Sequence, residues 1–410
     1  MLLVCAAATL AGTRTGTAAV RRPAHGQTLQ AVIDASQGGD IVEVPPGTWR
    51  ERLVIRTPIT LRGTGGVIDG EEHGTILEID APYVVVENVT LRNSGTDIIK
   101  QQACITMRAT AQHALVRGNR LERCLFGIYV DRSHHSAIID NVIGGRPDIR
   151  EPDRGNGIEL YDCERVRIIR NTVVGARDGI YVAATDDSVI SFNRTEHQRY
   201  GIHYMYSFRN TLEGNHSSHN LGGIALMVSN DLRVVDNVTD DNERHGILFR
   251  DNQRCELTGN VARRNIDGLF VYGSLHNRIA RNWIEGNEVG LRVWGGSRDN
   301  EISANAFVGN RHHVFYVGQE DLVVGIADPG NYWSEYIGWD QDADGVGDRP
   351  YRMDSMAVHL VHRYPAAIML VHSPALELLS NLEDKLPILR VATIVDRAPL
   401  VASPRERPDE

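Results

Sequence analysis

Apolar and polar residues alternate in short runs that return at a nearly constant interval along most of the chain. Each run has the pattern glycine, branched apolar residue, any residue, apolar residue, as in Gly201-Ile202-His203-Tyr204. Such runs begin at Gly127, Gly157, Gly179, Gly201, Gly223, Gly246, Gly268 and Gly290. Alternation predicts strands with one apolar face. An interval of about 22 residues holds three short strands and leaves no room for a helix.

An independent series of asparagines keeps the same interval. It comprises Asn119, Asn141, Asn171, Asn193, Asn215, Asn237, Asn260, Asn282 and Asn305. Both series carry the same surplus between positions 141 and 157, so residues 145–154 are predicted to form one inserted loop. Asparagines at one turn position would satisfy the turn backbone and tolerate the left-handed conformation. The glycine before each strand fits a turn with positive φ.

These repeats predict an all-β protein, a right-handed single-stranded parallel β-helix of about a dozen coils at residues 26–327, because a lone coil cannot bury its apolar face. A leucine-rich horseshoe is excluded because its LxxLxL pattern is absent. Residues 28–36 have helical spacing with Thr28 as N-cap, so a short helix is expected to cover the open first coil.

Both ends of the chain differ from the repeats. Residues 1–25 have the apolar and small residues of a secretory signal peptide, with cleavage expected near Ala18-Ala19. The C-terminal extension is predicted to be helical or irregular. It divides into a cap at 328–363, an amphipathic docking segment at 364–398 and a disordered tail at 399–410. Packing of 364–398 over the last coil is the open alternative. No apolar run is long enough to span a bilayer.

Charge and cysteine usage narrow the function. The 410-residue chain has a formal net charge of −10, which argues against phosphate-driven nucleic-acid binding. Cys104, Cys124, Cys163 and Cys255 lack CxxC spacing. We therefore expect them to be small buried hydrophobes, because the spacing gives no support for a disulfide, although an exported protein would permit one.

Several segments resemble known families. Residues 29–33 and 38–49 resemble the start of pectin-lyase-like β-helices, which include polysaccharide lyases, C5-epimerases and carbohydrate-binding CASH modules. Residues 200–207, 330–336 and 364–367 are similar to the NosD family of periplasmic copper-processing proteins. That resemblance implies a non-enzymatic periplasmic accessory protein that relays copper for maturation of nitrous-oxide reductase. The implied partners are an ABC transporter permease, a copper chaperone and the reductase.

The repeat brings candidate copper ligands together. Met205 and Met227 are one repeat apart and point outward, and His203 shares that face. A second set in a neighbouring turn column comprises His197, His219 and His216. Thioether sulfur and imidazole nitrogen suit Cu(I), so these six residues are the copper candidates. The alternative is that a loop or partner covers the methionines as ordinary packing.

An acidic loop suggests a second cation. Its candidate ligands are Asp340, Asp342, Asp344 and Asp348, with Gly345 at the tight turn. Alternating carboxylates around a glycine follow the logic of a calcium loop. Tyr351 stands where an EF-hand would have its bidentate glutamate, so a simpler structural Ca²⁺ loop is expected. The alternative is a solvated acidic turn.

A carbohydrate-active lyase or epimerase is the alternative function, and a passive sugar-binding module is a third. The outward residues that could serve such an enzyme are Asp131, Glu159, Asp178, Asp186, Asp187 and Arg292. Their spacing predicts no compact acid–base pair. The acidic net charge would also repel polyuronate substrates.

Overall fold

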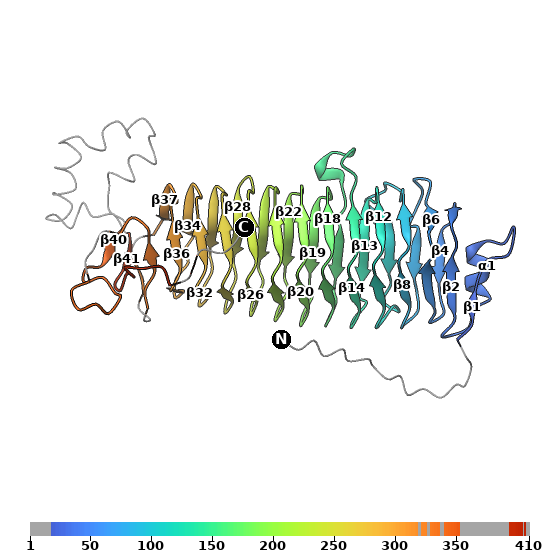
Figure 1. The fold of residues 1–410 in the computed structure, drawn as a ribbon, viewed down its shortest axis with the longest axis horizontal. Coiled ribbons are helices and arrows are strands. Elements are labelled where there is room, and N and C mark those ends of the chain that lie inside the picture. Colours follow the sequence, from blue (N-terminus) through green and yellow to red (C-terminus); the bar gives the residue numbers. More distant parts are fainter. Residues whose placement is uncertain are drawn as a thin grey trace.

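The computed structural model describes residues 18–318, 321–325, 329–336, 340–352, 393–404 and 406. Stacked coils form a long rod (Figure 1). Three sheets run along it, and every strand pair within them is parallel. The predicted parallel β-helix is therefore confirmed. The cooperative unit is the stack, because each strand finds its hydrogen-bond partners on the coils before and after it.

Sheet A has 13 strands. They are β1 (Val20–Arg21), β2 (Ile41–Val44), β5 (Thr60–Gly63), β8 (Val85–Glu87), β11 (Leu115–Arg117), β14 (Ala137–Ile139), β17 (Arg167–Ile169), β20 (Val189–Ser191), β23 (Thr211–Glu213), β26 (Arg233–Val235), β29 (Glu256–Thr258), β32 (Arg278–Ala280) and β35 (Glu301–Ser303).

Sheet B also has 13 strands. They are β3 (Gly47–Trp49), β6 (Gly66–Asp69), β9 (Thr90–Arg92), β12 (Arg120–Glu122), β15 (Val142–Gly144), β18 (Thr172–Val174), β21 (Arg194–Glu196), β24 (His216–Ser218), β27 (Val238–Asp240), β30 (Val261–Arg263), β33 (Trp283–Glu285), β36 (Ala306–Val308) and β39 (Tyr332–Trp333). The rod thus extends slightly beyond the predicted boundary at 327.

Sheet C has 12 strands and carries the repeated glycine motif. They are β4 (Leu53–Ile55), β7 (Leu77–Ile79), β10 (Ala103–Met107), β13 (Phe126–Asp131), β16 (Ile158–Tyr161), β19 (Asp178–Ala183), β22 (Tyr200–Met205), β25 (Gly222–Met227), β28 (His245–Arg250), β31 (Asp267–Tyr272), β34 (Val289–Trp294) and β37 (His312–Tyr316). Alternation sets the core: Ile202 and Tyr204 are fully buried inside the rod.

The asparagine ladder forms as predicted. In each coil, one asparagine Oδ1 accepts hydrogen bonds from the backbone N–H and amide of its counterpart on the preceding coil, as Asn237 does for Asn215. The left-handed backbone, however, falls on the residue before the asparagine, as at Asp236 with φ 52°. A second ladder, which the sequence analysis missed, joins Asn220, Asn242, Asn265, Asn287 and Asn310.

The prediction of positive φ at the repeated glycines is wrong. Gly179 and Gly201 are not among the glycines with positive φ. They lie within strands, where space rather than conformation requires glycine. A Cβ at Gly179 would lie 2.4 Å from the carbonyl oxygen of Gly201, and one at Gly201 would lie 2.4 Å from Thr195 Oγ1. Only glycine lets the coil pack this closely.

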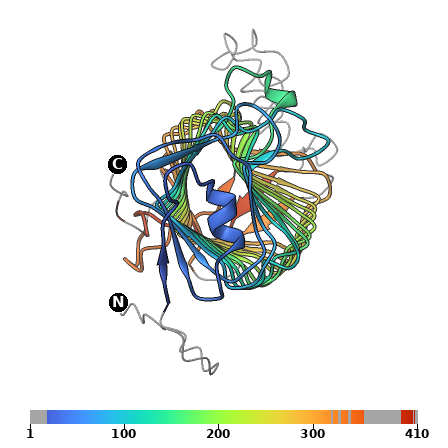
Figure 2. The ribbon, with the colours of Figure 1, turned by 90° about the vertical axis from the view of Figure 1, so that its right-hand side faces the viewer.

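The predicted N-terminal helix is confirmed as α1 (Leu29–Asp34), which closes the first coil (Figure 2). Thr28 is the N-cap and its side-chain oxygen accepts a hydrogen bond from Ala31 N. Glu51 adds two more bonds, because its carboxylate accepts from Leu29 N and Gln30 N. These contacts satisfy N–H groups that a helix start leaves open.

The chain ends differ from prediction in three places. Strand β1 pairs with β2, so residues 20 and 21 belong to the fold; this contradicts the leader boundary at 25 and leaves the expected cleavage near Ala18-Ala19 as a prediction. Strand β41 (Ile394–Asp396) pairs with β38 (Leu322–Val324) and β40 (Tyr351–Arg352), so the end of the docking segment is a strand. Leu400, placed in a disordered tail, is buried and bridges Tyr332 and Val346. Buried apolar side chains explain the order at the C-terminal end, where Ile394, Val395 and Leu400 are buried, whereas β1 is held by its pairing with β2. Residues 1–17 and 353–392 lie outside the described residues.

The cysteines divide into two kinds. Cys163 and Cys255 are free and buried, as predicted. Cys104 and Cys124 form a disulfide, which corrects the prediction for that pair. The pair joins β10 to the turn before β13 on the next coil, with Cα atoms 5.5 Å apart. Sequence spacing could not show it, because a strand residue meets a turn residue here rather than its own register partner. None of the helices in the described part of the chain is long and apolar enough to cross a membrane.

Candidate metal centre on the outer face of sheet C

One column of outward side chains crosses sheet C from strand to strand. In its first half the column contains Tyr129, Glu159, Tyr181 and His203, in register on β13, β16, β19 and β22. Its second half contains Ala225, Leu248 and Phe270 on β25, β28 and β31. His203 therefore lies where polar residues give way to apolar ones.

The predicted pairing of the two methionines is confirmed by the strand register. Met205 on β22 stands directly beside Met227 on β25. Both side chains are half-buried and lie on the outer face, because the alternate residues Tyr204 and Leu226 fill the core. His203 is two residues from Met205 on the same face, so one imidazole and two thioethers share a small area of sheet C.

His203 is nevertheless buried, with only 7% of its surface exposed. The rings of Tyr181 and Tyr200 lie over it, each with its centroid 5.0 Å from the imidazole centroid. Neighbouring outward side chains thus cover this histidine although no core residue does. Strand alternation predicts which face His203 lies on, but it does not predict that neighbouring side chains on that face bury it.

A carboxylate fixes the orientation of His203. Asp178 Oδ2 lies 2.8 Å from His203 Nδ1. Arg199 in turn donates two hydrogen bonds to the same carboxylate. Burial opposes ionisation of Asp178, but the hydrogen bonds from His203 and Arg199 outweigh it and the pKa of Asp178 lies below its ordinary value. This pair corrects the prediction that the outward acids form no compact acid–base pair.

Within the part of the chain that the structure describes, the second ring nitrogen of His203 is left without a partner. Among the described residues, His203 Nε2 is buried and has no hydrogen-bond partner. An ionised carboxylate accepts only, so Nδ1 is the donor to Asp178, and Nε2 is the ring nitrogen that remains as a candidate ligand atom. A histidine that ligates a metal characteristically donates its other N–H to a carboxylate. The soft donors on this part of the face are therefore the free nitrogen of His203 and, two residues further along the strands, the sulfurs of Met205 and Met227.

The other three copper candidates form a separate group. His197 and His219 lie in the turn between sheets B and C, exposed, with ring centroids 5.8 Å apart. His216 is on β24, and its Nε2 lies 2.8 Å from Asp240 Oδ1. The strand order thus places these histidines on a different part of the coil from the His203, Met205 and Met227 group, and the six candidates do not form one centre.

Glu159 is a functional candidate that the sequence analysis noted without a role. Its side chain is largely covered, and Asn156 Nδ2 donates to Glu159 Oε2 at 2.6 Å. Desolvation, reinforced by Asp178, raises its pKa to about 7. Tyr129 and Tyr181 stand on either side of it in the column. The sequence could have revealed this arrangement, because counting along the repeat places Glu159 between Tyr129 and Tyr181 on adjacent strands.

A second carboxylate-held histidine lies further along the same face. His245 Nδ1 is 3.0 Å from Asp267 Oδ2, and Arg292 Nε donates to Asp267 Oδ1 at 2.7 Å. His245 contacts Phe270 rather than tyrosines, with ring centroids 5.2 Å apart. The residues around His245 in register, Gly222 and Asp267, supply no sulfur. This unit is chemically similar to the first but lacks thioethers.

The acidic loop brings three of its four predicted ligands together. Carboxylate oxygens of Asp340, Asp342 and Asp344 lie within 4.8 Å of one another. Asp348 does not belong to this group; its Oδ2 accepts a hydrogen bond from Gln341 N. Asp340 also accepts from Asp344 N and Gly345 N, which fixes the turn.

The fold and this donor set define a parallel β-helix protein with a candidate site for a soft metal ion on its outer face. A family model described as periplasmic copper-binding protein (NosD) matches residues 139–338. A protein of Pseudomonas aeruginosa described as a probable ABC transporter binding protein NosD is 34% identical, over 99% of this chain and 100% of its own length. A Stutzerimonas stutzeri protein of the same description is 34% identical over 89% of this chain and 87% of its own. The chain belongs to the NosD family.

Solved structures share the architecture. The A-module of the mannuronan C-5 epimerase AlgE6 from Azotobacter vinelandii has a TM-score of 0.63 and 17% identity, over 74% of this chain and 92% of the module. The A-module of AlgE4 from the same organism has a TM-score of 0.61 and 15% identity, over 71% of this chain and 93% of the module. At these identities the likeness shows the fold alone.

Proposed function

We propose that this protein is a non-enzymatic periplasmic accessory protein that binds Cu(I) on the outer face of sheet C and relays it for the maturation of nitrous-oxide reductase. Membership of the NosD family supports the accessory role, because the matching model is described as a periplasmic copper-binding protein. The observation that carries the copper site is the buried, unpartnered Nε2 of His203, on the same face as the paired Met205 and Met227.

Each residue of the site has a distinct task in this proposal. Asp178 holds the His203 N–H and so presents Nε2 as the ligand atom. Arg199 keeps that carboxylate in place. Met205 and Met227 supply sulfur, which favours Cu(I) over harder ions. Tyr181 and Tyr200 cover the imidazole, so copper reaches Nε2 after one ring turns aside.

The exposed pair His197 and His219 fits a different step. Imidazole nitrogens at the surface bind copper less selectively than a thioether pair does. Their position in the turn makes them the accessible group of the six candidates. We assign them, with His216, to transient contact with copper arriving from a chaperone, and His203 with the methionines to retention.

The proposal also includes a transporter as partner and a structural calcium ion. Two relatives are described as probable ABC transporter binding proteins, which supports association with a transporter permease. Segment 364–398, most of which lies outside the described residues, is the part we assign to that contact. Asp340, Asp342 and Asp344 would hold a structural Ca²⁺ at the cap.

The pair Asp178–His203 also supports the alternative of a carbohydrate-active enzyme, because a carboxylate-held imidazole can act as a general base. The two methionines favour copper instead. A thioether does not transfer protons, so a methionine pair on this face has no role in a lyase or epimerase reaction.

A chelator competition for Cu(I) tests the proposed site. The double variant His203→Ala with Met205→Ala is expected to lose at least about 100-fold in Cu(I) affinity, because it removes two ligands. His245→Ala is the matched control, since that histidine is equally carboxylate-held but has no thioether beside it. Unchanged Cu(I) affinity in the double variant, with a native far-ultraviolet spectrum, would remove this site.

A further inference from the structure

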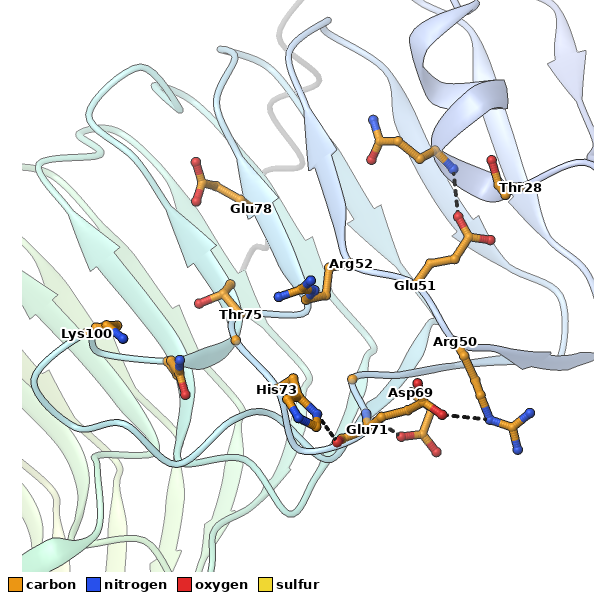
Figure 3. Close-up of a pocket in the computed structure, with 14 residues that line it drawn as sticks. Thr28, Arg50, Glu51, Arg52, Asp69, Glu71, His73, Thr75, Glu78 and Lys100 are labelled. Carbon is orange, nitrogen blue, oxygen red and sulfur yellow. Dashed lines mark hydrogen bonds and ion pairs between the residues drawn. The ribbon is translucent and has the colours of Figure 1, made fainter.

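A hollow of about 850 Å³ opens near the N-terminal end of the rod (Figure 3), and none of its lining residues belongs to the candidate copper site. It lies where α1, the first strands of sheet C and the turns between sheets B and C meet. Within the described part of the chain, every residue that lines it is polar, charged or glycine. Most small-molecule pockets are lined mainly by apolar side chains. An entirely polar lining suits a ligand that is polar over its whole surface, as a sugar is.

The carboxylates of this hollow are already engaged. Glu51 accepts two backbone N–H groups of α1. The other lining carboxylates meet these partners: Asp69 meets Arg92 and Asn93, Glu71 meets Arg50, and Glu78 meets Arg108. Arginines therefore offset the charge of Asp69, Glu71 and Glu78, while backbone donors hold Glu51, and the electrostatics of the hollow depend on its remaining cations.

The donors of the hollow are not used up. Within the described residues, Arg52 makes no hydrogen bond or ion pair, and its Nη1 lies over Gly74, where a Cβ would be only 3.0 Å away. Lys100 contacts Asp97 at 3.1 Å and keeps further N–H groups. Gln102 accepts from Asp97 N through Oε1, and Thr75 accepts from Ala103 N, so the Gln102 amide and Thr75 hydroxyl can still donate. Unused donors around one unpaired cation select a ligand that is rich in oxygen acceptors and negatively charged.

The inserted loop braces one wall of this hollow. The wall is the turn from Gly70 to Gly74, where Glu71 and Glu72 have φ of 52° and 63°. Glu72 is held by Arg123 at 3.3 Å and by Arg146 of the inserted loop at 3.5 Å. Arg146 is itself only 5% exposed and is paired with Asp148 at 2.9 Å. Arg146 of the inserted loop thus fixes this wall of the hollow through Glu72.

We propose that this hollow binds a short saccharide that carries a carboxylate, a uronic-acid oligosaccharide, with the carboxylate on Arg52 and hydroxyl groups on Thr75, Gln102 and Lys100. Arginine matches a carboxylate with two parallel N–H groups. The carboxylates that line the hollow retain lone pairs for sugar hydroxyl donors. A simple oxyanion would satisfy Arg52 alone and leave most of a cavity of this size without contact. The local cation explains how a protein of net negative charge would accept an anionic sugar.

Isothermal titration of the full chain with trigalacturonate tests this proposal. We expect binding that weakens at least about tenfold in Arg52→Gln, the loss typical of one charge-assisted contact. Methyl-esterified trigalacturonate, which keeps the hydroxyls but loses the charge, should bind similarly weakly. Arg120→Gln is the matched control, because that exposed arginine is paired with Glu122 on sheet B, outside the hollow. A second variant, Arg146→Ala, should also weaken binding by releasing the wall.

The outcomes separate clearly. No heat at millimolar trigalacturonate, or equal affinity in Arg52→Gln and the parent protein, would overturn the site. Inorganic phosphate that binds as tightly as trigalacturonate would show an oxyanion site only and overturn the saccharide assignment. The double copper variant His203→Ala with Met205→Ala should bind trigalacturonate normally, so this test is independent of the proposed copper function.

Discussion

The two halves of the outer face of sheet C use the same backbone for different chemistry. Both halves hold a histidine through Nδ1 on an aspartate that an arginine secures, at His203 and at His245. Around His203 the column is polar, with Glu159 and Tyr181, and two methionines stand beside it. Around His245 the column is apolar, with Leu248 and Phe270. The aspartate–histidine–arginine unit is therefore a structural motif of this face, and the sulfur atoms make only one copy a candidate for copper.

The cost of burial also differs between the halves. The first half holds the mostly buried carboxyl of Glu159, with a pKa raised to about 7, mainly by desolvation. The second half of the column holds the apolar Leu248 and Phe270 instead. A carboxyl that gains little from its surroundings destabilises the fold when it ionises. Glu159 therefore lowers stability at neutral pH, which the apolar residues of the second half do not.

The largest expected difference between the halves is in the pH dependence of stability, and Glu159→Gln tests it. Because the folded pKa lies above the unfolded one, Glu159 favours the folded state at low pH and loses that contribution as pH rises through about 7. The variant should abolish this loss. Its free energy of unfolding relative to the parent should rise by about 2 to 3 kcal/mol between pH 5 and pH 8.

Urea unfolding at both pH values measures that difference. Glu288→Gln serves as the control, because Glu288 is exposed and paired with Arg311 on the surface. Its relative stability should change little between the two pH values. A pH dependence in Glu159→Gln equal to that of the parent would contradict a buried carboxyl and remove the distinction between the halves.

The next largest expected effect is on Cu(I) affinity, which should differ between variants of Asp178 and Asp267. Asp178→Asn should weaken Cu(I) binding about 10- to 100-fold, the usual cost of losing the carboxylate behind a ligating histidine. Asp267→Asn should change it less than about twofold, because His245 lies among residues without sulfur. Chelator competition measures both variants under one set of conditions. Equal losses in the two variants would show that copper does not discriminate between the halves.

The coils could be predicted well from the sequence because the same contacts recur in every coil. Each coil repeats one asparagine contact, so the ladder from Asn119 onward could be inferred by counting. The same counting placed Met205 beside Met227. Asp178 and His203, however, are 25 positions apart rather than one repeat, because their side chains meet diagonally. Diagonal contacts depend on the length and direction of the side chains, and the repeat spacing gives only the backbone register.

The regions outside the period were harder to predict for a related reason. Cys104 and Cys124 meet between a strand and a turn, so no register relation links them. Leu400 and strand β41 return from the far end of the sequence to close the last coils. Asp396, from that strand, ends the asparagine ladder by accepting from Asn331 N and Nδ2. A long-range contact made once leaves no repeated signal.

The smallest expected effect concerns the cap, where hard oxygen ligands replace the soft donors of sheet C. Ca²⁺ should raise the melting temperature by about 2 to 4 °C, and EDTA should remove the gain, because the ion binds only the folded loop. The double variant Asp342→Asn with Asp344→Asn should lose this response, since it removes two of the three clustered carboxylates. Asp251→Asn, an exposed acid within the coils, is the matched control and should keep it. Melting that ignores both Ca²⁺ and EDTA would leave the loop an acidic turn. Cu(I) affinity should stay the same in all three proteins, because a carboxylate cluster and a thioether–imidazole site select different metals.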